Sequence, residues 1–151
     1  MIKILFVCLG NICRSPMAEF MFKDLISKNG LQGKFIVDSA ATSYEEEGNS
    51  LYPPARDILY KYHIPIGNHK AHRIQKSDYD KYDLIIGMDD GNIFNILRII
   101  GEDPKGKVHK LLDYSNNPHD IADPWYTGNF EIAYQDIKEG VEALFNFFVE
   151  K

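Results

Sequence analysis

A short segment near the N-terminus holds residues whose types and spacing suit phosphate chemistry. Residues 8–15 read CLGNICRS, so that Arg14 follows Cys8 after an interval of five residues. Gly10 permits a left-handed backbone and Asn11 tolerates one, so the segment can curl until its N–H groups face inward. Such a nest binds an anion, and the N-terminus of a following helix adds attraction. Because the guanidinium of Arg14 is a planar fork that suits two oxygens of a tetrahedral oxyanion, the pattern predicts a phosphate site.

Cys8 lies at the base of this predicted nest. The groups that favour phosphate also favour a thiolate, and cysteines in such surroundings are largely ionised near neutral pH. We therefore expect Cys8 to attack phosphorus, and we expect the hydroxyl of Ser15 to hydrogen-bond the sulfur and help it leave in a second step. The alternative interpretation is a small buried cysteine beside a surface arginine, which the surrounding glycine, asparagine and proline disfavour.

A thiolate that displaces an alkoxide or phenolate needs a proton donor on the far side of phosphorus. The best candidate is Asp123, at the start of the segment DPWY. The following proline disfavours a helical backbone at Asp123, and we expect Trp125 and Tyr126 to lie on a loop before the last helix. An ordinary Asp-Pro turn is the alternative interpretation of this segment.

The strands and helices that must position these residues alternate along the chain. Apolar and β-branched runs predict buried strands at 2–8, 34–38, 82–88 and 107–112. Helical spacing and end signals predict helices at 16–29, 55–62, 77–81, 92–100 and 129–149, and residues 39–54 are a polar, turn-rich stretch. Such alternation implies a parallel sheet with helices on both faces, and ligands then bind beyond the carboxyl ends of the strands. The loop 8–15 follows the first strand at that edge.

Composition limits the classes of partner. The chain has 151 residues, of which 44% are hydrophobic, enough for one buried core. Its 22 acidic and 17 basic residues leave a net charge of −5, so no overall positive field exists to hold a nucleic acid or an anionic membrane. The apolar run 2–9 is too short to span a bilayer and lacks a signal-peptide cleavage pattern. We expect a cytoplasmic protein. The sequence leaves open both export without a recognisable signal and the oligomeric state.

Several other polar residues have simpler interpretations than a functional site. The two cysteines are too few for a disulfide scaffold or a four-cysteine zinc site. His69 and His72 lack partners at metal-ligand spacing, and we interpret them as histidines that brace a loop or lie at the surface. Asp89 and Asp90 follow a predicted strand and could line the crevice there, but capping of the next helix is the simpler explanation. The sequence predicts no metal site.

Taken together, the motifs resemble those of a known family. A strand followed by CLGNICRSPMAE, then SAAT at 39–42 and DPWY at 123–126, closely resembles the low-molecular-weight protein tyrosine phosphatases over essentially the whole chain. The resemblance implies that Cys8 is a nucleophile forming a cysteinyl-phosphate, that Arg14 clamps phosphate, and that Asp123 is general acid and then general base. It also implies a phosphotyrosine-containing protein as substrate, with neither metal nor other cofactor.

The fold expected with this resemblance is a single α/β domain spanning residues 1–151. We predict a four-stranded parallel sheet in the order 2-1-3-4, with helices on both faces. The resemblance also implies that Asn11 and Ser39 form a hydrogen-bonded pair that holds the loop, while Ser15 supports the sulfur. The rest of the phosphate-binding loop is then Leu9, Gly10, Ile12 and Cys13.

Cys13 has two open interpretations. In the family, a cysteine at this place can form a reversible disulfide with the nucleophile, which protects the nucleophile from further oxidation. A simple filling role in the loop is the alternative.

A phosphotyrosine ring needs a deep slot with apolar walls. The side chains expected to form these walls are Leu9, Ile12, Tyr44, Trp125 and Tyr126. Many family members carry an aromatic residue near position 44, but here Glu45, Glu46 and Glu47 follow Tyr44, so the wall residue at this side stays open. We interpret the acidic run as a solvated turn, which beside the pocket would disfavour acidic peptides.

Two related activities and one non-catalytic role are the alternatives to a tyrosine phosphatase. In the related protein arginine phosphatases the position of Ile12 is typically threonine, so isoleucine favours phosphotyrosine, with phosphoarginine as the alternative. Thioredoxin-coupled arsenate reductases need further cysteines to relay a disulfide, and none follows Cys13. A non-catalytic phosphate-binding module would have no use for both Cys8 and Asp123.

Overall fold

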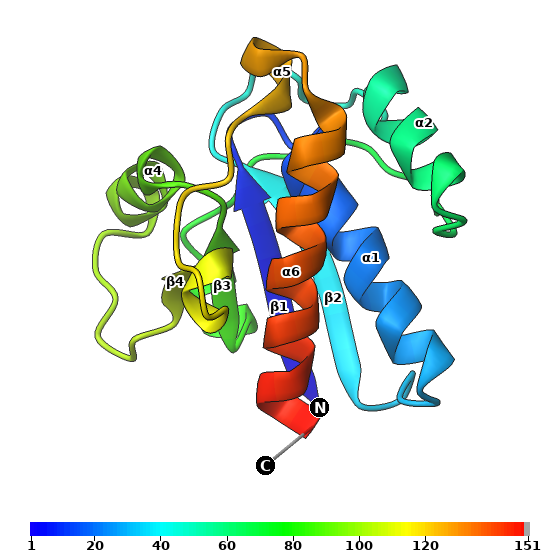
Figure 1. The fold of residues 1–151 in the computed structure, drawn as a ribbon. Coiled ribbons are helices and arrows are strands. Elements are labelled where there is room, and N and C mark those ends of the chain that lie inside the picture. Colours follow the sequence, from blue (N-terminus) through cyan, green and yellow to red (C-terminus); the bar gives the residue numbers. More distant parts are fainter. Residues whose placement is uncertain (150–151) are drawn as a thin grey trace.

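Four parallel strands and the helices around them form one α/β domain. The computed structural model describes residues 1–149, and its sheet has the predicted order β2-β1-β3-β4 (Figure 1). The strands are β1 (Ile2–Cys8), β2 (Phe35–Ala41), β3 (Leu84–Gly87) and β4 (Val108–Lys110). The α-helices are α1 (Arg14–Lys28), α2 (Pro53–Lys61), α3 (Asp78–Lys81), α4 (Asp90–Ile100), α5 (Pro124–Thr127) and α6 (Phe130–Val149), and a 3-10 helix, η1, spans Leu111–Tyr114.

The central strand β1 is buried on both faces, which explains its continuous apolar sequence. Ile4 and Phe6 point into a core that includes residues of α1 and α6, whereas Leu5 and Val7 point into a second core with residues of α3 and α4. Figure 1 shows α6 crossing in front of β1, with α4 away to one side of the sheet. No helix within residues 1–149 is long and apolar enough to cross a membrane.

Strand β2 continues beyond its predicted end. The sequence predicts a polar turn from Ser39 onward, but Ser39, Ala40 and Ala41 belong to the strand and are buried. Their small side chains fit beside β1, where Ser39 pairs with Phe6 and Ala41 pairs with Cys8. The extension therefore brings Ser39 to the carboxyl end of β1, where the loop 8–15 begins.

The segment after Asp123 is a short helix, α5, rather than the predicted loop. Asp123 caps this helix, because its Oδ1 accepts a hydrogen bond of 3.0 Å from the N–H of Trp125. Pro124 stands in the first turn, where its missing N–H costs nothing. Helix α5 thus holds Asp123 at the carboxyl edge of the sheet.

Candidate active site

Asn11 shapes the loop between β1 and α1. It is the only residue of the segment 8–15 with a positive φ, 59°, so the left-handed position is Asn11 and not Gly10. Its amide donates hydrogen bonds of 2.8 Å to the Oγ of Ser15 and 3.0 Å to the Oγ of Ser39. The structure therefore contains the Asn11–Ser39 pair that the resemblance implies. Because Asn11 is fully buried, this pairing also satisfies a side chain that would otherwise be costly to bury.

Two further residues outside the loop brace Asn11 and Ser39. The ring Nε2 of His69 lies 2.6 Å from the carbonyl oxygen of Asn11, which accepts its proton. The hydroxyl of Ser39 donates to Glu19 Oε1 at 2.6 Å, and Glu19 is almost fully buried on α1. The loop-bracing interpretation of His69 is confirmed. The role of Glu19 was not predicted, since its sequence neighbours are those of an ordinary amphipathic helix.

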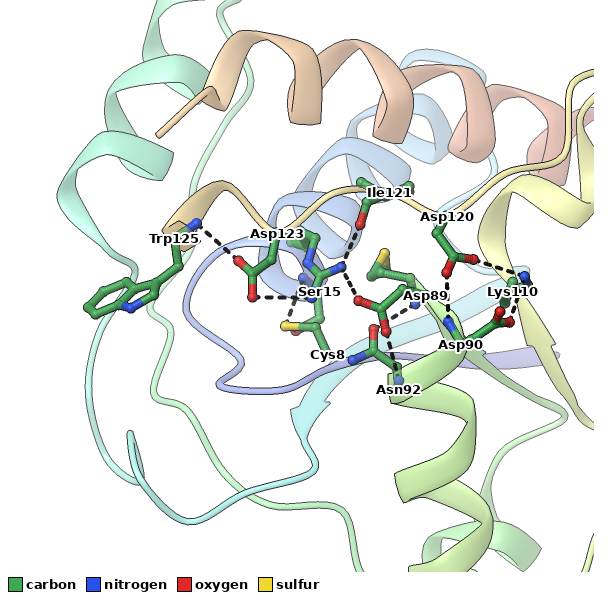
Figure 2. Close-up of polar contacts among 12 residues, drawn as sticks. Cys8, Ser15, Asp89, Asp90, Asn92, Lys110, Asp120, Ile121, Asp123 and Trp125 are labelled. Carbon is green, nitrogen blue, oxygen red and sulfur yellow. Dashed lines mark hydrogen bonds and ion pairs between the residues drawn. The ribbon is translucent and has the colours of Figure 1, made fainter. Parts of the chain in front are cut away.

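Cys8 ends β1 with its sulfur beside hydrogen-bond donors. The Sγ lies 3.0 Å from the Oγ of Ser15 and 3.4 Å from its backbone nitrogen (Figure 2). Because the Ser15 hydroxyl already accepts from Asn11, its own proton is free to point at the sulfur. Within residues 1–149, the N–H groups of residues 10–13 have no hydrogen-bond acceptor. These free N–H groups and the N-terminus of α1 make the loop a favourable place for an anion.

Arg14 is 2% exposed and extends its guanidinium between three segments. Its NH1 donates to Asp89 Oδ2 at 2.8 Å and to the carbonyl oxygen of Ile121 at 2.6 Å. Its NH2 lies 3.4 Å from Asp123 Oδ2. Burial alone would lower the pKa of Arg14, but Cys8 and the acidic partners outweigh burial and raise it. The guanidinium is therefore charged and held in one orientation.

Asp89 combines two roles, of which the sequence predicted one. Its Oδ1 accepts from the N–H of Asn92 at 2.7 Å and so caps α4, as predicted. Its other oxygen holds Arg14. A cap residue directly after a strand at the carboxyl edge of the sheet is the only signal that would have indicated this second role.

Ten of the predicted site residues line one cavity, which opens at the carboxyl ends of the strands. They are Cys8, Leu9, Gly10, Asn11, Ile12, Cys13, Arg14, Asp123, Trp125 and Tyr126. The enclosed volume is ≈ 90 Å³, well below the roughly 300–1,000 Å³ of pockets that hold a whole drug-sized ligand or cofactor. Ser15 and Ser39 are buried and do not line the cavity, consistent with a supporting position.

Tyr44 does not reach the cavity. The guanidinium of Arg73 lies over the Tyr44 ring, with its Cζ 4.7 Å from the ring centroid. The Tyr44 hydroxyl accepts a hydrogen bond from Arg73 NH1 at 3.2 Å. Glu45 and Glu46 line the cavity at this side instead. Two residues of the acidic run are therefore part of the wall, so the run lies beside the pocket and is more than the solvated turn that the sequence favoured.

The aromatic residues of α5, Trp125 and Tyr126, form another part of the wall. Trp125 is half exposed, and its ring lies against that of Tyr52, with the centroids 4.8 Å apart. Tyr126 is 76% exposed at the rim. An apolar ring that enters the cavity would therefore lie beside aromatic surfaces.

The two cysteines are both free thiols. Burial, with Cys8 and Asp123 nearby, raises the pKa of Cys13, so its thiol stays protonated at neutral pH. A disulfide between the two cysteines stays a prediction. Among residues 1–149 no group of three or more histidine, cysteine, aspartate or glutamate side chains is placed to hold a metal ion.

Comparisons with known proteins agree on one family. The family model described as low molecular weight phosphotyrosine protein phosphatase matches residues 3–151. The low molecular weight protein-tyrosine-phosphatase YfkJ of Bacillus subtilis is 43% identical over 146 residues, covering 95% of this chain and 94% of its own. The crystal structure of YfkJ covers 99% of this chain and 96% of its own, with a TM-score of 0.95 and 41% identity.

Two more distant relatives widen the comparison. The low molecular weight phosphotyrosine protein phosphatase of Saccharomyces cerevisiae is 40% identical over 144 residues, covering 90% of this chain and 88% of its own. The crystal structure of an arginine phosphatase from Drosophila covers 98% of both chains, with a TM-score of 0.89 and 29% identity.

Proposed function

Because the chain belongs to the low molecular weight phosphotyrosine protein phosphatase family and is thus a phosphatase, we propose that it hydrolyses phosphotyrosine monoesters through a cysteinyl-phosphate intermediate. The observation that carries this proposal is the meeting of three side chains at one cavity. Cys8, Arg14 and Asp123 all line it, and Arg14 contacts Asp123 directly. The chain thereby brings together a nucleophile, a phosphate clamp and a proton carrier.

In the first step the thiolate of Cys8 attacks phosphorus and the ester P–O bond breaks. Arg14 uses its NH1 for Asp89 and Ile121, which leaves Nε, and the NH2 proton that does not face Asp123, to hold two phosphate oxygens. The unpaired N–H groups of residues 10–13 stabilise the charge on the transferring phosphoryl group. Asp123, protonated, gives its proton to the departing tyrosine oxygen.

In the second step water attacks the phosphocysteine, and the P–S bond breaks. Asp123, now a carboxylate, accepts a proton from the water, and inorganic phosphate leaves. The thiolate of Cys8 is the leaving group, and the Ser15 hydroxyl, 3.0 Å away, stabilises it by hydrogen bonding. None of these steps requires a metal ion, since Arg14 and the backbone N–H groups supply the positive charge.

The substrate proposed is a phosphotyrosine-containing protein. Trp125, Tyr126 and Ile12 at the cavity suit an aromatic ring. Phosphoarginine is the second candidate, because an arginine phosphatase shares the fold at 29% identity. We also propose a cytoplasmic location, since a nucleophilic thiol works best where thiols are kept reduced.

The test is hydrolysis of an aryl phosphate and of matched phosphotyrosine and phosphoarginine peptides, with a metal chelator present. We expect the wild type to cleave the aryl phosphate and the phosphotyrosine peptide, and Cys8→Ser to be inactive on both, because serine at this position is a far poorer nucleophile. Activity that disappears with the chelator would overturn the mechanism. A preference for the phosphoarginine peptide would show that phosphoarginine, and not phosphotyrosine, is the substrate.

A further inference from the structure

A second ionic cluster lies next to the site, at the end of β4. The Nζ of Lys110 lies 2.8 Å from Asp90 Oδ1 and 2.9 Å from Asp120 Oδ1, as Figure 2 shows. The other oxygen of Asp120 accepts the backbone N–H of Asp90 at 3.1 Å. Three segments are thereby connected: the end of β4, the start of α4, and the segment 115–123 that leads to Asp123.

Both carboxylates of this cluster are chain neighbours of groups that hold Arg14. Asp90 follows Asp89, whose carboxylate accepts from Arg14 NH1 at 2.8 Å. Asp120 precedes Ile121, whose carbonyl oxygen accepts from the same nitrogen at 2.6 Å. The cluster therefore holds the two acceptors that orient the guanidinium, because each acceptor belongs to a residue next to one of the two carboxylates.

The charges in the cluster make Lys110 the component that holds it together. Without the ammonium group, Asp90 and Asp120 would be two neighbouring carboxylates that repel each other. Hydrogen bonds from Lys110 to both raise the pKa of the lysine, so it carries its charge at any physiological pH. Burial would raise the pKa of Asp120, but the hydrogen bonds from Lys110 and from the Asp90 N–H outweigh it and lower that pKa.

We propose that Lys110 is a positioning residue, whose ammonium group holds the segment 115–123 against the start of α4 so that Asp89 and Ile121 keep Arg14 ready for phosphate. Lys110 does not line the cavity and does not touch the substrate. The inference rests on the proposed role of Arg14 as the phosphate clamp. Loss of the Lys110 ammonium group should therefore change the affinity for a phosphate-like anion and the turnover number, and not the stability alone.

The experiment compares Lys110→Met with Lys110→Arg, and uses Lys61→Met as a matched control. Lys61 makes an ion pair of similar length, 2.7 Å to Glu131, between α2 and α6, and it lies outside the cavity. Orthovanadate is the probe, with its inhibition constant, kcat on an aryl phosphate and the thermal midpoint measured for each variant. Turnover of the wild type and its inhibition by vanadate test the proposed function. The role of Lys110 is tested only by the ratios of the variant's inhibition constant and kcat to those of the wild type.

We expect Lys110→Met to weaken vanadate binding and to lower kcat by about 3- to 30-fold each. Lys110→Arg restores both to within about twofold, and Lys61→Met leaves both within about twofold. Unchanged vanadate affinity in Lys110→Met, or a loss that arginine does not restore, overturns the proposal. Should Lys110→Met not fold, Asp120→Asn takes its place, with the same expected direction, and a wild-type vanadate affinity there also overturns it.

Discussion

At the scale of single residues, Asp123 is already held on both of its oxygens before a substrate arrives. Oδ1 caps α5 through the N–H of Trp125, and Oδ2 faces Arg14 at 3.4 Å. The same contacts that fold α5 thus orient the proposed proton donor beside the proposed phosphate clamp. Removal of this carboxylate should affect the protonation of the leaving group while leaving the nucleophile in place.

Asp123→Ala should lower kcat by about 10²- to 10⁴-fold on a phosphotyrosine peptide, the usual contribution of a general acid. The loss should be smaller for aryl phosphates whose leaving groups are weak bases, because these depart without a proton. The measurement is kcat across a series of aryl phosphates, with the exposed Asp57→Ala as control. A dependence on the leaving group that equals that of the wild type would contradict the role of Asp123.

At the scale of elements, the loop after β2 is held by the segment 69–73. Gly48 donates its N–H to the carbonyl of Ala71 at 2.8 Å, and the N–H of Arg73 donates to Glu47 Oε2 at 3.1 Å. Since Arg73 also holds Tyr44, this anchoring turns Tyr44 away. Glu45 and Glu46 are the loop residues left at the cavity.

The acidic wall formed by Glu45 and Glu46 should make the enzyme prefer phosphotyrosine peptides with basic flanks over those with acidic flanks, since like charges repel at the rim. The double variant Glu45→Gln/Glu46→Gln should reduce the ratio of the two kcat/KM values by about 2- to 10-fold, the range for two exposed charge pairs.

The comparison is made at low and high salt, because screening should shrink the preference of the wild type. Glu47→Gln is the matched control, since Glu47 belongs to the same run but does not line the cavity. Equal ratios in the wild type and the double variant would refute an electrostatic role for this wall.

At the scale of the whole molecule, α6 closes one face of the sheet by close approach to η1. A Cβ added at Gly140 on α6 would lie 2.4 Å from the Cγ of Leu111, closer than atoms can pack. Leu111 is fully buried and directly follows Lys110 in the chain. The packing of the last helix is therefore tied to the strand end that bears the proposed positioning residue.

Gly140→Ala should lower the free energy of unfolding by about 1–2 kcal/mol, because so close an approach puts the overpacking cost at about 2–3 kcal/mol, the upper part of its usual range, and alanine returns about 1 kcal/mol of helix propensity. Urea unfolding measures the difference. Gly33→Ala is the control, since a Cβ there meets no atom within 4 Å. A Gly140→Ala protein at least as stable as the wild type would show that η1 moves aside at little cost.

The order of strands and helices was predictable because it rests on local patterns. Apolar runs and helical spacing placed the four strands, and they placed α6 to within a residue of its start, whereas the sheet order was expected from the family resemblance. The end of β2 and the short helix α5 were not predicted. Small residues such as Ser39 and Ala41 carry no strand signal of their own, and only pairing with β1 makes them a strand.

The proposed phosphate loop with Cys8 and Arg14 was indicated by the sequence itself, because the proposed nucleophile, a turn and a helix start lie within eight consecutive residues. Which residues surround that loop was decided only by the tertiary structure. His69 and Ile121 reach it from two distant segments, and Glu19 supports it through Ser39, by contacts that no sequence pattern records. Local backbone preferences act between neighbours in the chain, whereas these contacts exist only once packing brings the segments together.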